Sequence, residues 1–324
     1  MVHTAAMALS DLDYEQWLGL ADRDARRLAE EIADRVGAEL VEVRAGSYAG
    51  RRTRSALFSR DGVIYGLVPG GRVSVGYDGR RFTGTAAQVA EYAGSAEEYG
   101  LPADIREFVD RMTSPPRVVG LRPLLVAVEA QEAGLRAVSP EDSRIAELVA
   151  DSQADFFMHQ LPPPSIEWNG RARAELAPDG TVVRAWLIEV PTLAEEKSRL
   201  AGEGLRLLTP DEWEHACGAG ATTLFRWGDH CPADRYPDGP AALNQEPNAF
   251  GLRIAHDPYR DERTADPAVV CGGDGGGMMC GGAGFFLAWL TLATSYRDTD
   301  HGDWTVQNDD DPLKNLVRPA IPLT

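Results

Sequence analysis

The chain of 324 residues is poor in cysteine, with only four. That is too few to indicate a fold held together by disulfides at this length. No two of the cysteines form a C-x-x-C pair, which is the usual arrangement in a zinc knuckle. A G-x-S-x-G nucleophile elbow is also missing, so the sequence gives no sign of an α/β-hydrolase.

Basic residues and long apolar runs are scarce as well. Against 50 acidic residues there are 32 Lys and Arg, which leaves a net charge of −18. Because such a surface repels phosphate backbones and anionic lipid, we expect neither a nucleic-acid nor a membrane partner. The longest apolar run, residues 284–293, is about half of the roughly 20 residues that cross a bilayer. Residues 1–10 lack the basic start of a secretory signal, so we expect a cytoplasmic protein.

Helical and strand-like patterns alternate irregularly along the chain, and no internal repeat is visible. Residues 10–37 predict one long helix, because apolar residues recur on one face and Gly37 is a suitable stop. Many short strands, a few helices and long loops indicate an α+β fold rather than a βαβ one. Further strands are expected at 56–58, 63–68, 69–78, 118–129 and 181–190, and further helices at 85–112, with Pro102 opening its second part, and from 139.

The segment from Arg206 to Cys217 carries the clearest local signal. Thr209 can cap a helix, Pro210 suits its first position, and Glu212, three residues after the cap, completes a capping box. A helix beginning here would place three apolar residues on one face, namely Trp213, Ala216 and Cys217.

Five segments carry short sequence motifs that occur together, in this order, in one protein family. The third of them ends in the helix just described, and Trp227-Gly228-Asp229 follows it. The five are Val68-Pro-Gly-Gly-Arg-Val-Ser-Val-Gly76, Arg117 to Glu129, Val190 to Glu214, Asn248-Ala-Phe-Gly-Leu252, and Val270-Cys-Gly-Gly273 with Arg318.

These motifs resemble the formylglycine-generating enzyme family, also called the sulfatase-modifying-factor family. The resemblance runs from residue 43 to the C-terminus. It implies a C-type-lectin-like, loop-rich α+β domain at 43–324, with an added N-terminal helical extension at 1–42.

The family's chemistry uses two cysteines, five residues apart, that hold copper(I) and oxidise a substrate cysteine; soft thiolates suit that ion. In this chain Cys280 matches the first thiol only with an insertion, and Phe285 stands in place of the second. Cys271 replaces the usual arginine. A glycine-rich turn could gather Cys271, Cys280 and the sulfurs of Met278 and Met279 into a soft-metal site. Otherwise the segment is a loop with one buried and one exposed cysteine.

For other metals, the sequence contains only fragments of the known binding motifs. The family's calcium segment is replaced by residues 253–262, where Asp257, Asp261 and Glu262 could supply oxygen ligands. Alternating aspartates at 298–303, with more at 308–311, lack the spaced Glu of an EF-hand.

The histidines, too, form only fragments of metal-binding motifs. Iron-using relatives of the ergothioneine type carry three histidines on a separate N-terminal domain, whereas only His3 precedes the fold here. His215 and Cys217, with His230-Cys231, could form a zinc site, but positions two apart diverge on a helix. We therefore assign no metal, and neither copper nor calcium has an intact motif.

Three functions follow from these observations. The first is a divergent family member whose cleft binds a peptide, a small molecule or a protein partner without the copper oxidase chemistry. The second is a thiol- or metal-dependent oxidase with Cys271 and Cys280 as its catalytic residues. The third is an enzyme that uses Asp, His and Tyr from the loop at 248–262. The candidate ligand-binding residues are Asn248, Asp257, Tyr259, Trp289 and Arg297.

Overall fold

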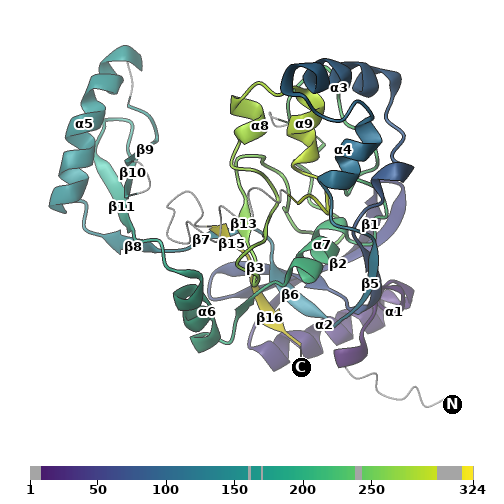
Figure 1. Ribbon diagram of the computed structural model, residues 1–324. Helices are drawn as coiled ribbons and strands as arrows, with labels where there is room; N and C mark the ends of the chain where they lie inside the picture. The colour runs from purple at the N-terminus through teal and green to yellow at the C-terminus, as the bar shows by residue number, and fades with distance from the viewer. Residues whose placement is uncertain (1–8, 160–161, 169–170, 238–242, 298–315, 324) are drawn as a thin grey trace.

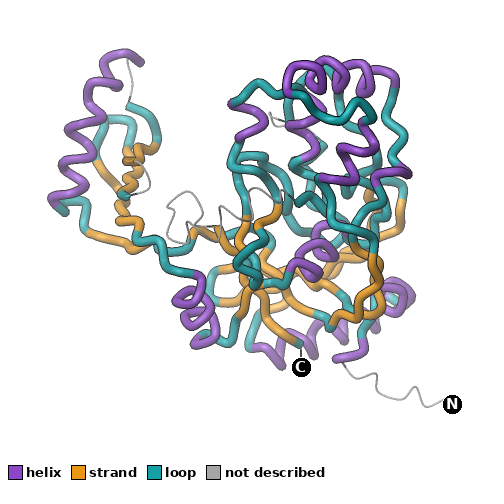
Figure 2. The backbone as a smooth tube through the Cα atoms, in the orientation of Figure 1, coloured by secondary structure: helices purple, strands orange, loops and turns teal. Residues whose placement is uncertain are grey.

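The computed structural model describes residues 9–159, 162–168, 171–237, 243–297 and 316–323. It is an α+β protein built on an antiparallel six-stranded sheet in the order β1-β2-β3-β6-β16-β12 (Figures 1 and 2). No helix in these ranges has the length and apolarity to cross a bilayer. The strands are β1 (Glu39–Tyr48), β2 (Arg51–Arg60), β3 (Val63–Val68), β6 (Leu124–Ala127), β16 (Pro319–Pro322) and β12 (Arg206–Leu207).

The N-terminal segment forms two main helices, α1 (Tyr14–Gly19) and α2 (Asp22–Val36), after a short turn of 3-10 helix at Leu9–Asp11. The prediction of one helix at 10–37 was therefore wrong. Leu20 and Ala21 are extended, with ψ of 145° and 151°. The guanidinium of Arg54 donates to the carbonyl of Leu20 at 2.6 Å, which satisfies the end of α1 without a further helical turn.

The two faces of the sheet carry separate hydrophobic clusters, because side chains alternate along each strand. On β6, Leu125 and Ala127 join the cluster under α1 and α2, while Leu124 and Val126 join the main core on the other face. The main core is covered by four helices, α3 (Ala86–Tyr99), α4 (Ile105–Arg111), α7 (Pro210–Gly218) and α9 (Phe285–Leu290). Figure 1 shows the sheet between these helices and the pair α1 and α2.

Two predicted elements are divided in the structure. The helix expected at 85–112 is split into α3 and α4, and α4 starts from the side-chain cap of Asp104 rather than from Pro102. The strand expected at 118–129 is split into β5 (Arg117–Leu121) and β6, with Pro123 between them. Strand β5 pairs only with β4 (Gly71–Val75), away from the large sheet.

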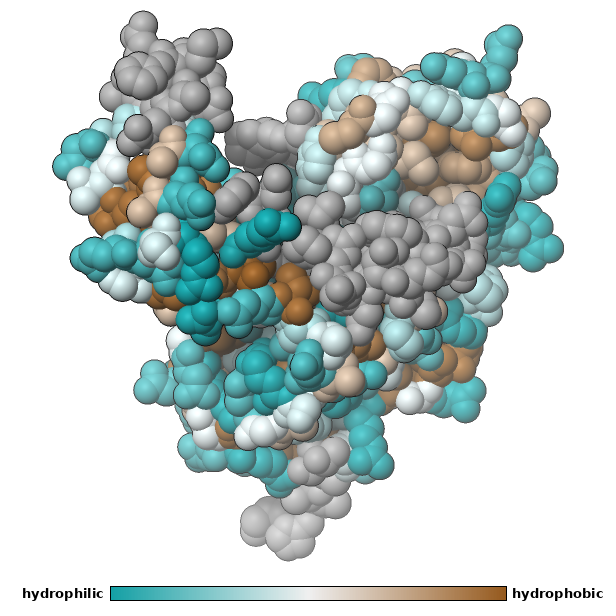
Figure 3. Space-filling view, turned by 60° about the vertical axis from the view of Figure 1, so that its left-hand side comes forward, coloured by the Kyte–Doolittle hydropathy of each residue, from teal (hydrophilic) through white to brown (hydrophobic). Residues whose placement is uncertain are grey.

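Residues 135–188 contain a second, smaller unit that stands apart in Figures 1 and 2. Its four-stranded sheet packs against α5 around its own cluster, which includes Ile145, Leu148 and Leu187. Figure 3, turned to bring this side forward, shows apolar side chains exposed on it among polar ones. The division at residue 42 stays a prediction, although β1 runs across it. The elements are β8 (Leu135–Val138), α5 (Ser143–His159), β9 (Ser165–Trp168), β10 (Ala172–Leu176) and β11 (Val182–Ile188).

A small sheet beside the main core positions the chemistry discussed below. Its order is β14-β13-β15-β7, and β13 pairs with β14 so that Glu262 lies opposite Cys271. The elements are β14 (Val270–Cys271), β13 (Glu262–Arg263), β15 (Leu316–Val317) and β7 (Gln131–Glu132). Helix α6 (Leu193–Gly202) shares a hydrophobic cluster with β15, and α8 (Gly277–Cys280) follows β14 in the chain.

Candidate functional site

The capped helix predicted after Arg206 is confirmed as α7. The Thr209 hydroxyl accepts a hydrogen bond from the Glu212 N–H at 3.3 Å, and the Glu212 carboxylate accepts one from the Thr209 N–H at 2.9 Å. Trp213, Ala216 and Cys217 are buried on the helix, as their spacing predicts. Helix α7 is therefore part of the main core, and its Asp211 and Glu214 pair with Arg117 on β5.

Glu214 on α7 is the centre of a buried polar network. Its side chain is 1% exposed and accepts hydrogen bonds from the Ser114 hydroxyl at 2.7 Å and the Gly76 N–H at 2.8 Å. The guanidiniums of Arg117 and Arg297 add ion pairs at 3.0 and 2.5 Å. Arg117 also pairs with Asp211, so two arginines balance two carboxylates and the network fixes the positions of the arginines.

Arg297 connects this network to the first candidate cysteine. One of its N–H groups faces the sulfur of Cys271 at 3.1 Å, while another holds Glu214. Cys271 is fully buried in β14. Burial raises the pKa of the Cys271 thiol to about 12, although the charge of Arg297 opposes that rise. The thiol is therefore protonated at neutral pH, and thiols in that state are poor nucleophiles and poor metal ligands.

The second candidate cysteine has a different environment. Cys280 is exposed at the end of α8, and its sulfur lies 3.7 Å from the hydroxyl of Tyr259. The Asp257 carboxylate accepts a hydrogen bond from the Tyr259 N–H at 2.9 Å, which shapes the turn that carries the ring. Cys280, Asp257 and Tyr259 are thus brought together by the structure.

The glycine-rich loop before Cys280 is held in one conformation by Asp274. Its carboxylate accepts hydrogen bonds from the N–H groups of Gly276 at 2.9 Å and Met278 at 2.8 Å. The Pro258 carbonyl accepts from the Asp274 N–H at 3.1 Å, so the two loops are joined. Gly276 has φ of +83°, and a Cβ there would lie 2.1 Å from the Tyr259 ring. Only glycine fits this close approach.

A pocket of about 330 Å³ opens beside these two loops. Tyr259 is 49% exposed at its edge. Arg253 on another wall is paired with Glu129 at 2.9 Å. The pocket therefore combines an aromatic ring, a thioether and several polar groups; its walls include Gln245, Arg253, His256, Asp257, Tyr259 and Met279.

Asn248 and Trp289 belong to the frame around the site. The Asn248 amide donates to the carbonyls of Ala216 and Cys217, and its oxygen accepts from two N–H groups in its own turn. The indole N–H of Trp289, buried in α9, donates to the Arg235 carbonyl at 2.9 Å. Both side chains are occupied by internal contacts.

The predicted calcium and zinc residues have other partners. Glu262 accepts from the Trp213 indole N–H at 2.8 Å and pairs with Arg318 at 2.6 Å. The imidazole Nε2 of His215 faces the Pro69 carbonyl at 2.7 Å. Across the ranges that the structure describes, no three His, Cys, Asp or Glu side chains are placed to hold a metal ion. The aspartate-rich residues 298–303 and 308–311 lie outside the described residues.

Met279, named above as a candidate metal ligand, and His256, the histidine of the loop at 248–262, both line the pocket. Sequence reasoning missed the role of Glu214 and the pocket residue Gln245. Their partners come from distant parts of the chain, and no local spacing indicates them. Scans of protein-family models and searches of curated proteins and solved structures find no match for this chain.

Proposed function

We propose that this chain is a divergent member of the formylglycine-generating enzyme family, with that family's C-type-lectin-like fold, and that it binds a peptide or small molecule at the pocket beside Tyr259. In this proposal the chain binds its ligand and has no two-cysteine copper oxidase centre. The observation that carries the proposal is the contrast between Cys271, which is fully buried with the Arg297 guanidinium at its sulfur, and Cys280, which is exposed beside the Tyr259 hydroxyl.

The surroundings of Cys271 do not fit a copper thiolate. Copper(I) binding requires loss of the thiol proton, which burial opposes here. The Arg297 guanidinium faces the sulfur and is itself held by Glu214, so a second cation would have to displace an anchored positive charge. The residues at this position therefore support a structural role for Cys271.

The pocket has the features of a recognition site. Variable loops on a rigid frame commonly carry binding residues, and here Asp274 and Pro258 fix both loops. A flat or apolar group of the ligand would lie against Tyr259 and Met279. One oxygen of Asp257 accepts the Tyr259 N–H, so the carboxylate has capacity to accept a donor from the ligand.

The first test measures thiols and copper. A chromogenic disulfide reagent should titrate one thiol per native chain, Cys280, and all four after denaturation, because the other three are buried. After anaerobic loading with copper(I) and desalting, the chain should retain no stoichiometric metal. Retention of one copper per chain that is lost in both Cys271→Ser and Cys280→Ser would support the oxidase and refute the binding proposal.

The second test measures binding. A library of short peptides and small polar molecules is screened by thermal shift against the wild type, Tyr259→Ala and Tyr259→Phe. Hits should lose their shift in Tyr259→Ala, while Tyr259→Phe separates the ring from its hydroxyl. Val183→Ala removes a comparably exposed apolar side chain on β11 that does not line the pocket and should leave the hits unchanged. The proposal would be contradicted by hits whose thermal shift is the same in Tyr259→Ala as in the wild type, or by a library without hits.

A further inference from the structure

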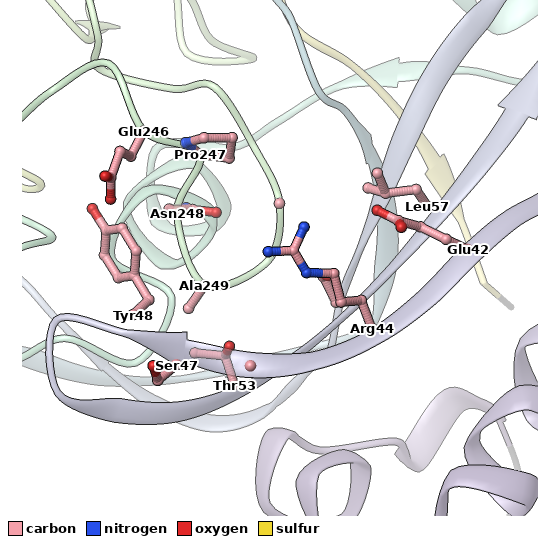
Figure 4. A pocket seen from close by; sticks show the side chains of 13 residues that line it. Glu42, Arg44, Ser47, Tyr48, Thr53, Leu57, Glu246, Pro247, Asn248 and Ala249 are labelled. Carbon is pink, nitrogen blue, oxygen red and sulfur yellow. The ribbon is translucent and has the colours of Figure 1, made fainter. Parts of the chain in front are cut away.

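A second pocket lies between the β1-β2 hairpin and the loop at 246–249 (Figure 4). Its volume is about 360 Å³. One wall comes from the two strands and the other from the loop, so segments about 200 residues apart in the sequence meet here. The polar walls are formed by Glu42, Arg44, Ser47, Tyr48, Thr53 and Glu246.

Arg44 enters this pocket as an available cation. Figure 4 shows its guanidinium projecting from β1 into the space in front of the loop that carries Asn248. Among the described residues it makes no hydrogen bond or ion pair, and neither does the side chain of Glu42 two residues earlier on the same strand face. Such a planar guanidinium is suited to bidentate binding of a carboxylate.

The opposite end of the pocket carries a negative charge. Figure 4 shows the Glu246 carboxylate beside the Tyr48 hydroxyl, and the charge of Glu246 contributes to raising the Tyr48 pKa, after burial and against Arg226. Within the described part of the chain the Glu246 carboxylate has no ion pair. The pocket therefore presents the Arg44 guanidinium, with the Glu42 carboxylate on the same strand, at one end and the Glu246 carboxylate at the other.

A buried arginine holds this end rigid. Arg226 is fully buried and donates to the Tyr48 hydroxyl at 2.5 Å and to the Glu246 carbonyl at 2.7 Å. Its guanidinium lies between two rings, 5.8 Å from that of Tyr48 and 5.3 Å from that of Trp227. Because both the ring and the loop backbone are fixed, little ordering entropy remains to be lost when a ligand binds.

A pocket of about 340 Å³, which Asp229 and His230 also line, adjoins the charged one and shares Tyr48 and Glu246 with it. It adds Trp227 and Leu243, and the latter is 48% exposed although it is apolar. Together the two pockets form a cleft with two charged positions of opposite sign and an apolar extension beyond Tyr48.

We propose that this cleft binds a free α-amino acid with an apolar side chain. The carboxylate pairs with Arg44, the ammonium group pairs with Glu246, and the side chain lies against Trp227 and Leu243. Both ion pairs are charge-assisted hydrogen bonds, and the apolar contact supplies side-chain selectivity. This site is separate from the Tyr259 pocket, so either proposal can fail without the other.

Isothermal titration calorimetry with L-phenylalanine tests the proposal on the full chain. We expect saturable binding of one ligand per chain, weakened about tenfold or more by Arg44→Met and by Glu246→Gln. Glycine, N-acetyl-L-phenylalanine and phenethylamine lack the side chain, the ammonium charge and the carboxylate in turn, and each should bind about tenfold or more weakly. Arg23→Met removes an exposed arginine on α2, outside the cleft, and should leave the affinity unchanged.

Three results would overturn the proposal. They are the absence of binding by L-phenylalanine and L-leucine, equal binding of any of the three analogues, and unchanged affinity in Arg44→Met. Circular dichroism of each variant shows whether it is folded, and Arg44 and Glu246 are exposed enough for the substitutions to leave the core intact. Tyr259→Ala should bind L-phenylalanine like the wild type, which distinguishes this site from the pocket proposed above.

Discussion

Replacing Glu262 by glutamine should destabilise the protein more than any exposed charge change. Glu262 pairs with Arg318 through two hydrogen bonds, at 2.8 and 2.6 Å, and it accepts a third from the Trp213 indole at 2.8 Å. Its side chain is 4% exposed and that of Arg318 is 1% exposed. Removing one partner of such a buried pair costs about 3–5 kcal/mol, because the other charge is left unpaired.

The geometry prevents Arg318 from relaxing to water. Its remaining N–H groups donate to the carbonyls of Ala127, Val128 and Arg253 at 2.6, 2.7 and 3.0 Å. These carbonyls belong to the end of β6 and a neighbouring loop, so moving the guanidinium would leave them unsatisfied as well. A glutamine amide at position 262 would also direct its own N–H donors at a guanidinium N–H of Arg318, because only one of its two terminal atoms accepts hydrogen bonds.

Urea unfolding followed by tryptophan fluorescence measures the effect. Glu30→Gln provides the control, because it breaks the Arg26–Glu30 pair whose side chains are 66% and 55% exposed, respectively. That loss should be below about 1 kcal/mol. The double variant Glu262→Met with Arg318→Met should lose less than the sum of the two single variants, since it leaves neither charge unpaired.

A loss below about 1 kcal/mol for Glu262→Gln would refute this reasoning, because it would match an exposed pair rather than a buried one. Strict additivity in the double variant would refute it too, because that result would mean that the two side chains do not interact.

Three further predictions concern single positions. Burial lowers the pKa of His215, so the unfolded chain takes up a proton that the folded chain does not; stability should fall below about pH 6.5, by up to about 1.4 kcal/mol per pH unit, and His215→Gln should flatten that fall in urea titrations. Gly276→Ala should displace the Tyr259 ring and speed thiol labelling at Cys280, whereas Gly275→Ala, with open space at its Cβ, should cost only backbone strain and leave labelling unchanged. Thr209→Ala should lower the free energy of unfolding by about 0.5–2 kcal/mol, and a threonine-to-serine change there should not.

Local rules predict those elements whose ends are set by neighbouring residues. The capping box of Thr209 is present, and the strands expected at 63–68 and 181–190 appear as β3 and β11 within two residues. The α+β class follows from the same patterns. The helix at 10–37 was mispredicted because its interruption depends on Arg54, which approaches from β2.

The candidate site could be predicted only in part for a similar reason. Asp257 and Tyr259 share a turn, and a glycine-rich loop near them is visible in the sequence. The environment of Cys271 is not visible in the sequence, because it depends on Arg297 and Glu214, which are 26 and 57 positions away from it along the chain. A sequence shows that two cysteines are present, but their burial and charged neighbours decide whether either becomes a thiolate.

The helix that suggested the family resemblance also bears on the fate of Cys271. Glu214 on that helix holds Arg297, and Arg297 faces the Cys271 sulfur. Trp213 on the same helix holds Glu262, which pairs with Arg318 and lies opposite Cys271 in the small sheet. Two charged networks, both anchored on α7, thus enclose one buried thiol. A frame can therefore be retained while a thiol beside it stays protonated, and binding residues on the outer loops can change without disturbing that frame.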